Sequence, residues 1–136
     1  MTGSAAIRAG LAYGLLAFAL GFILGIVRTF LVAPALGAFA AVAIEIPVML
    51  ASCVPLAVWC LRRWRIARWG NAALMGLAGF AVLMICEVLL GLALGQGLQA
   101  ILAAMGKPAG LLGLAGQIAF ALLPLGWTAA QRLPRQ

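Results

Sequence analysis

The sequence contains no aspartate and no histidine, and it has only two acidic residues among its 136 positions. Without histidine, the usual ligand sets of zinc, haem and di-iron sites cannot be assembled, so we expect no bound metal and no cofactor. The three cysteines, Cys53, Cys60 and Cys86, lie inside apolar runs and are odd in number, which argues against a disulfide framework. Charged residues make up only 8% of the chain, far below the share in an ordinary soluble domain.

Apolar residues make up 67% of the chain. A chain of this length cannot bury that much apolar surface in one soluble core, so a bilayer is the expected solvent. A membrane β-barrel would alternate apolar and polar residues in segments of about ten, whereas these apolar runs are long and unbroken. We therefore predict an all-α integral membrane protein, a four-transmembrane-helix bundle formed by a single membrane domain, residues 1–136.

Each apolar run is near or above the roughly 20 residues that cross the hydrocarbon core of a bilayer. The expected spans are residues 9–32, closed by Pro34, then residues 36–61, 71–94 and 109–127. A basic connection, residues 62–69, joins the second span to the third. An outer connection, residues 95–108, joins the third to the fourth and is expected to hold a short interfacial helix. The first run is too long for the apolar core of a cleaved signal peptide, so we expect it to be retained.

The net charge of +7 is distributed as in a membrane protein rather than a nucleic-acid-binding protein. Four arginines cluster in the basic connection: Arg62, Arg63, Arg65 and Arg68. Because basic residues are kept on the cytoplasmic side, we predict that this connection and both termini are cytoplasmic, in a bacterial inner membrane. The same four arginines suit contact with anionic lipid head groups.

Every predicted span carries one strongly polar side chain: Arg28, Glu45, Glu87 and Gln117. At about 1.5 Å per residue, each of them lies roughly 6–13 Å from the outer end of its helix. Charged residues inside spans are costly and are functional candidates by default. We therefore expect an intramembrane polar cluster in the outer half of the bundle.

Small residues on the first span form a stripe with spacings of three and four, and Arg28 continues that stripe. Its glycines are Gly10, Gly14, Gly21 and Gly25. Such faces let helices approach closely, so we expect the stripe to pack against a neighbouring helix. The second span contains Pro47 and Pro55, which are either packing kinks or, at Pro47, the source of a freed carbonyl beside Glu45.

Two interpretations of the polar cluster remain open from the sequence. Arg28 could pair with Glu45 or Glu87 only to define how the bundle packs. Alternatively, because one guanidinium cannot neutralise two carboxylates, the second carboxylate would take up a proton or bind a cation. The cluster would then be a proton-holding or cation-binding site.

The run Gly21–Gly37, which includes Arg28 and Pro34, is followed by Glu45-Ile-Pro47-Val-Met49. Together these segments resemble a group of uncharacterised bacterial four-span inner-membrane proteins. The resemblance covers mainly the first two spans and their connection. It implies the four-span fold and the inner-membrane location, and it implies no activity.

From the sequence we expect a small membrane protein that transports a proton, another cation or a small solute through the polar cluster. The alternative is a non-catalytic accessory or structural subunit, docked on a larger membrane complex through the glycine stripe. We expect no enzyme activity, because Ser52 and Cys53 have no base beside them in the sequence. The expected partners are the lipid bilayer and either further copies of this chain or a partner membrane protein, and not nucleic acid.

Overall fold

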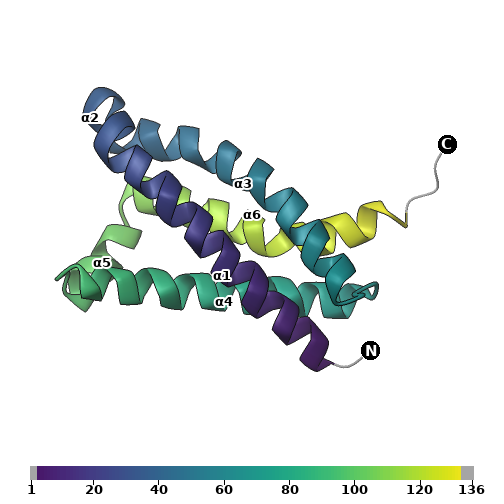
Figure 1. Ribbon diagram of the computed structural model, residues 1–136. Helices are drawn as coiled ribbons and strands as arrows, with labels where there is room; N and C mark the ends of the chain where they lie inside the picture. The colour runs from purple at the N-terminus through teal and green to yellow at the C-terminus, as the bar shows by residue number, and fades with distance from the viewer. Residues whose placement is uncertain (1–2, 133–136) are drawn as a thin grey trace.

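The computed structural model describes residues 3–132, and this part of the chain is helical with short connections and no strand. Four of its helices are long and apolar enough to cross a membrane, which confirms the predicted all-α bundle (Figure 1). The elements are α1 (Gly3–Val27), the π-helix η1 (Arg28–Val32), α2 (Ala33–Leu36), α3 (Ala38–Arg63), α4 (Trp69–Ala93), α5 (Leu98–Met105) and α6 (Pro108–Ala130).

The first apolar helix continues past Pro34, where we expected it to end. In a regular α-helix, Pro34 would lack an N–H for the bond to residue 30, and its ring would collide with that carbonyl. The chain avoids the collision with the wider π turn of η1, in which the Ala33 N–H donates to the Arg28 carbonyl five residues back. The helix ends instead at Gly37, whose φ of 88° is readily adopted only by glycine.

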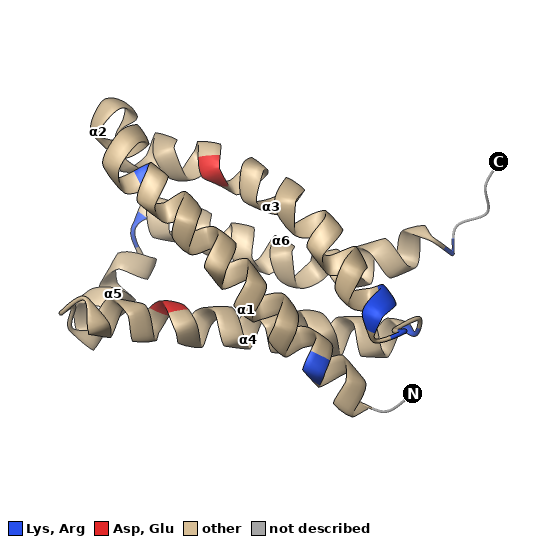
Figure 2. Ribbon diagram, in the orientation of Figure 1, with Lys and Arg blue, Asp and Glu red and all other residues tan. Residues whose placement is uncertain are grey.

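The four long helices form a ring in the order α1, α4, α6, α3, with each helix packed against its two neighbours in that ring. The start of α1, the end of α6 and the connection between α3 and α4 lie at one end, which we name the basic end (Figure 1). The opposite end contains η1, α2 and α5, and we name it the distal end. Figure 2 shows most of the Lys and Arg at the basic end and both glutamates nearer the distal end.

The tightest packing lies in the half of the bundle next to the basic end. There α4 meets α1 and α6 almost backbone to backbone, because glycine stands at the points of contact. A Cβ atom added to Gly10 would lie 2.7 Å from the Met75 carbonyl oxygen, and one added to Gly76 would overlap the Ala121 carbonyl oxygen. These contacts require the absence of a side chain.

A single tyrosine crosses the centre of the ring from α1 to α6. The Tyr13 ring is fully buried and stacks on the Phe120 ring with centroids 4.1 Å apart. Its hydroxyl donates a 2.7 Å hydrogen bond to the Phe120 carbonyl oxygen. That carbonyl is the one that Pro124, four residues later, cannot bond, because proline has no N–H. Tyr13 thus satisfies a backbone acceptor that the proline has released.

The half next to the distal end is packed more loosely. The buried residues of α1 end at Ala17, and those of α3, apart from Ala41, lie between Cys53 and Leu61. Beyond Ala17, large side chains point outward, and Phe30 and Leu31 of η1 are 73% and 70% exposed. The two polar pairs described below lie in this half.

Two helices end with the same pair of backbone hydrogen bonds, the Schellman motif. At the end of α4, the Gln96 N–H donates to the Gly91 carbonyl, with Gly95 at a φ of 86°. At the end of α3, the Ile66 N–H donates to the Leu61 carbonyl, and the residue at the left-handed position is Arg65, with a φ of 53°. A non-glycine residue in this conformation costs about 1–2 kcal/mol.

The first prediction concerns the Tyr13 hydroxyl. Tyr13→Phe keeps the ring stack but leaves the Phe120 carbonyl without its partner, so we expect it to lower the free energy of unfolding by about 1–3 kcal/mol. Pro124→Ala restores an N–H to the helix, so Tyr13→Phe should cost less in that background. Unfolding of the four proteins of this double-mutant cycle in mixed detergent micelles measures the difference. An equal cost in both backgrounds would contradict the link between hydroxyl and proline.

The second prediction concerns the contact between α4 and α6. Gly76→Ala places a methyl group on the Ala121 carbonyl oxygen, and we expect it to cost about 1–3 kcal/mol or to prevent folding. Gly113→Ala in α6 is the matched control, because its Cβ would meet nothing within 4 Å. We expect the control to be neutral or to stabilise by up to about 1 kcal/mol through helix propensity. Thermal unfolding in detergent separates the two variants.

Candidate functional site

Arg28 and Glu45 form a salt bridge between the first two long helices. Arg28 Nη1 donates to Glu45 Oε2 at 2.6 Å. Arg28 begins the π turn of η1, so the turn that accommodates Pro34 also positions its guanidinium. The guanidinium lies close to Gly25, where a Cβ atom would be 3.7 Å from Nη2. The Arg28 side chain is 36% exposed and the Glu45 side chain 16%, so the carboxylate is the more enclosed partner.

Glu87 and Gln117 form the second polar pair, between α4 and α6. Gln117 Nε2 donates to Glu87 Oε2 at 2.5 Å, and the bond is partly buried. The carboxylate therefore has a neutral amide as its hydrogen-bond partner. Within residues 3–132, no salt bridge joins Glu87 to a basic side chain.

The four polar side chains singled out in the sequence thus form two pairs, one in each helical hairpin. The sequence left open whether Arg28 pairs with Glu45 or with Glu87, and in the structure it pairs with Glu45. The pairs are separate in hydrogen bonding because α3 and α4, which carry the two glutamates, are opposite each other in the ring of helices.

The glycine stripe of the first helix is used mostly inside the chain. Gly10 and Gly14 pack on α4 at Met75 and Gly79. Gly21 faces α3, with the Met49 methyl carbon 3.4 Å from the position of a Cβ, and Gly25 lies beside Arg28. The stripe therefore turns from α4 to α3 as α1 runs towards the distal end.

Three prolines lie inside the long helices. Pro47 and Pro55 are in α3, and Pro47 follows Glu45 by two residues. Pro124, in α6, was not singled out from the sequence, and neither was Tyr13. Two features of the sequence could have indicated them. Pro124 must leave the carbonyl of residue 120 without its helical hydrogen bond, and the chain contains a single tyrosine.

The arginines of the basic connection divide into two groups. Arg62 and Arg65 line a groove together with Arg132 from the end of α6. Arg63 lies over the Trp64 ring instead, 5.5 Å from its centroid, and Arg68 precedes α4 as its N-cap residue. The place of Arg132 beside this connection could not be read from the sequence, because it depends on how α6 packs.

The chemistry available at the polar pairs is that of carboxylates and amides. Among the described residues, no group of three potential metal ligands comes together. The Ser52 hydroxyl donates to the Val48 carbonyl of its own helix at 2.8 Å. The site thus holds one carboxylate paired with a guanidinium, Glu45, and one, Glu87, whose hydrogen-bond partner is a neutral amide. Comparisons with family models, curated proteins and solved structures found no match.

The third prediction compares the same substitution at the two glutamates. Glu45→Gln removes the charge that neutralises Arg28, so we expect a loss of about 0.5–3 kcal/mol in the free energy of unfolding. Glu87→Gln preserves an amide–amide hydrogen bond with Gln117, so its cost should be below about 0.5 kcal/mol. Arg28→Gln combined with Glu45→Gln should recover part of the first loss. Equal costs for the two single variants would contradict the assignment of the ion pair.

Proposed function

We propose that this chain is a multi-pass protein of the bacterial inner membrane that moves protons, or a small cation, by way of Glu87. The observation that carries the proposal is the asymmetry between the two carboxylates. Glu45 has the Arg28 guanidinium 2.6 Å away, whereas the direct hydrogen-bond partner of Glu87 is the neutral amide of Gln117. A carboxyl group in apolar surroundings without a counter-charge either carries a proton or binds a cation. Glu87 can do both in turn.

The proposed orientation has the basic end and both termini in the cytoplasm. It is supported by Figure 2, which shows most of the Lys and Arg at the basic end. Arg8 lies in the first turns of α1 and Arg132 follows α6, whereas Arg28 begins η1 and Lys107 precedes α6. The large exposed side chains of the long helices are apolar, as lipid contact requires. In this orientation both glutamates lie in the half of the bundle that faces away from the cytoplasm.

The packing supports a site that opens towards the distal end. The half next to the basic end is closed by the glycine contacts of α4 and by Tyr13 across the ring. The distal half has few buried residues. We propose that a proton or cation reaches Glu87 from the distal side, and that release to the cytoplasm requires the closed half to open. Further copies of the chain or a partner membrane protein would complete the path.

A catalytic role has less support than transport. Neither polar pair contains a hydroxyl or thiol nucleophile, and the Ser52 hydroxyl is bonded within its own helix. The alternative of an accessory subunit relied on the glycine stripe as a docking face. Gly10 and Gly14 are covered by α4, so that half of the stripe is not available to another protein.

The fourth prediction tests transport directly. Purified protein in liposomes with a trapped pH-sensitive dye should dissipate an imposed proton gradient faster than empty liposomes do, or should take up Na⁺ or K⁺. Glu87→Gln should lower that flux at least tenfold, because it removes the exchangeable group while leaving the fold intact. Glu87→Asp, which retains a carboxyl group, should keep part of the activity.

The control variant is Gln99→Ala in α5, whose side chain is exposed and belongs to neither of the two polar pairs. It should transport like the unmodified protein. Flux of protons, Na⁺ and K⁺ no greater than in empty liposomes would overturn the proposal. So would a flux that Glu87→Gln leaves unchanged.

A further inference from the structure

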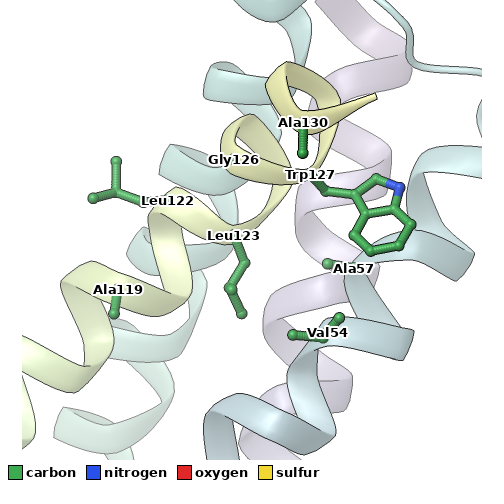
Figure 3. Close-up of a pocket in the computed structure, with 8 residues that line it drawn as sticks. All are labelled: Val54, Ala57, Ala119, Leu122, Leu123, Gly126, Trp127 and Ala130. Carbon is green, nitrogen blue, oxygen red and sulfur yellow. The ribbon is translucent and has the colours of Figure 1, made fainter. Parts of the chain in front are cut away.

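A groove between α3 and α6 runs along the half of the bundle next to the basic end. It has a cavity volume of about 370 Å³ and is lined almost entirely by apolar side chains (Figure 3). The groove exists because small residues stand where the two helices face it: Ala57 on α3, and Ala119, Gly126 and Ala130 on α6. A Cβ atom on Gly126 would meet nothing within 4 Å, so the space is not filled from elsewhere in the chain.

The length of this groove matches one leaflet of a bilayer. Its lining on α6 extends from Ala119 to Ala130. Eleven steps along a helix at about 1.5 Å each cover roughly 16 Å. Half of a hydrocarbon core about 30 Å thick is roughly 15 Å. The groove is therefore about as long as the acyl-chain region of the adjacent leaflet is thick.

A second groove continues the first at the basic end. Trp127 lines both of them, and Figure 3 shows its indole projecting from α6 towards α3. The second groove has a volume of about 420 Å³ and brings together Arg62, Arg65 and Arg132. Within residues 3–132 none of these three arginines forms a salt bridge, and both glutamates of the chain lie away from this end (Figure 2). Three positive charges are thus left without a counter-ion in the described part of the chain.

Two contacts hold Arg132 at this place. Arg132 Nη2 donates to the Ala67 carbonyl at 2.7 Å, and its guanidinium lies 5.6 Å from the centre of the Trp69 ring. Arg65 occupies the left-handed position of the turn after α3, where glycine would be more stable. Unfavourable backbone conformations persist only where the surrounding structure holds them, and they cluster at sites that bind ligands.

We propose that the joined grooves bind one phospholipid with an anionic head group, its phosphate against Arg62, Arg65 and Arg132 and one acyl chain between α3 and α6. Charge complementarity calls for an anion at the basic end. The apolar continuation past Trp127 requires that this anion carry a long hydrocarbon chain, which inorganic phosphate and acidic peptides lack. The inference rests on insertion into a bilayer, with the basic end at the membrane surface, and not on transport.

The test is native mass spectrometry of the purified protein after equilibration with phosphatidylglycerol or phosphatidylcholine in detergent. The unmodified protein should retain one phosphatidylglycerol per chain, at least tenfold more than phosphatidylcholine. Arg65→Gly should lower this retention about fivefold while leaving the fold at least as stable, because glycine suits the left-handed turn. Arg63→Gln removes a charge from the same connection outside the groove and should leave retention unchanged.

The apolar part of the site is tested with all charges in place. Gly126→Leu fills the groove with a side chain and should abolish retention of phosphatidylglycerol. Gly113→Leu, on the same helix where a Cβ is also unobstructed, is the matched control and should retain it. Inorganic phosphate at millimolar concentration should not displace the bound lipid.

Three results would overturn the proposal. Equal losses for Arg63→Gln and Arg65→Gly would mean that charge at the surface attracts lipid without a site. Unchanged retention in Gly126→Leu would mean that only the head group is held. A dimer that persists without lipid and dissociates in Gly126→Leu would mean that a second copy of the chain occupies the groove.

Discussion

The close approach of α4 to α1 and α6 determines how the other helices of this protein lie. At Gly10, Gly14 and Gly76 a backbone oxygen of the neighbouring helix leaves no room for a Cβ atom. The first two contacts hold α1 on α4 where the two helices cross at an oblique angle (Figure 1). An oblique crossing that is tight in one half of a bundle leaves the other half open. The loosely packed distal half, with its two polar pairs, follows from this constraint.

Proline and polar side chains are coupled at two places in the fold. Pro124 releases the Phe120 carbonyl, and the Tyr13 hydroxyl takes that acceptor at the centre of the ring. Pro34 is accommodated by the π turn that begins at Arg28, and Arg28 is the residue that pairs with Glu45. In apolar surroundings a freed carbonyl or a charge must find a partner within the protein. The prolines therefore help to determine where polar side chains are placed.

Charge divides the molecule into two ends with different chemistry. The basic end carries arginines that form no salt bridge within residues 3–132, around a groove that continues along α3 and α6, which suits it to anionic lipid. Towards the distal end, the carboxylates of Glu45 and Glu87 differ in their partners, a guanidinium for one and an amide for the other. The proposed lipid site and the proposed transport site are therefore separate in position, and each can be altered without the other.

The sequence by itself determined the helical class, the number of long apolar helices and the concentration of arginine in one connection, because these depend on composition and on runs along the chain. It also singled out Arg28, Glu45, Glu87 and Gln117, since charge inside an apolar run is visible without any contact. Only the tertiary structure decided that Arg28 pairs with Glu45, that Glu87 is left with an amide, and that Arg132 joins Arg62 and Arg65. Those partnerships depend on which helices are neighbours and at what rotation, and many weak packing contacts, far apart in sequence, set both.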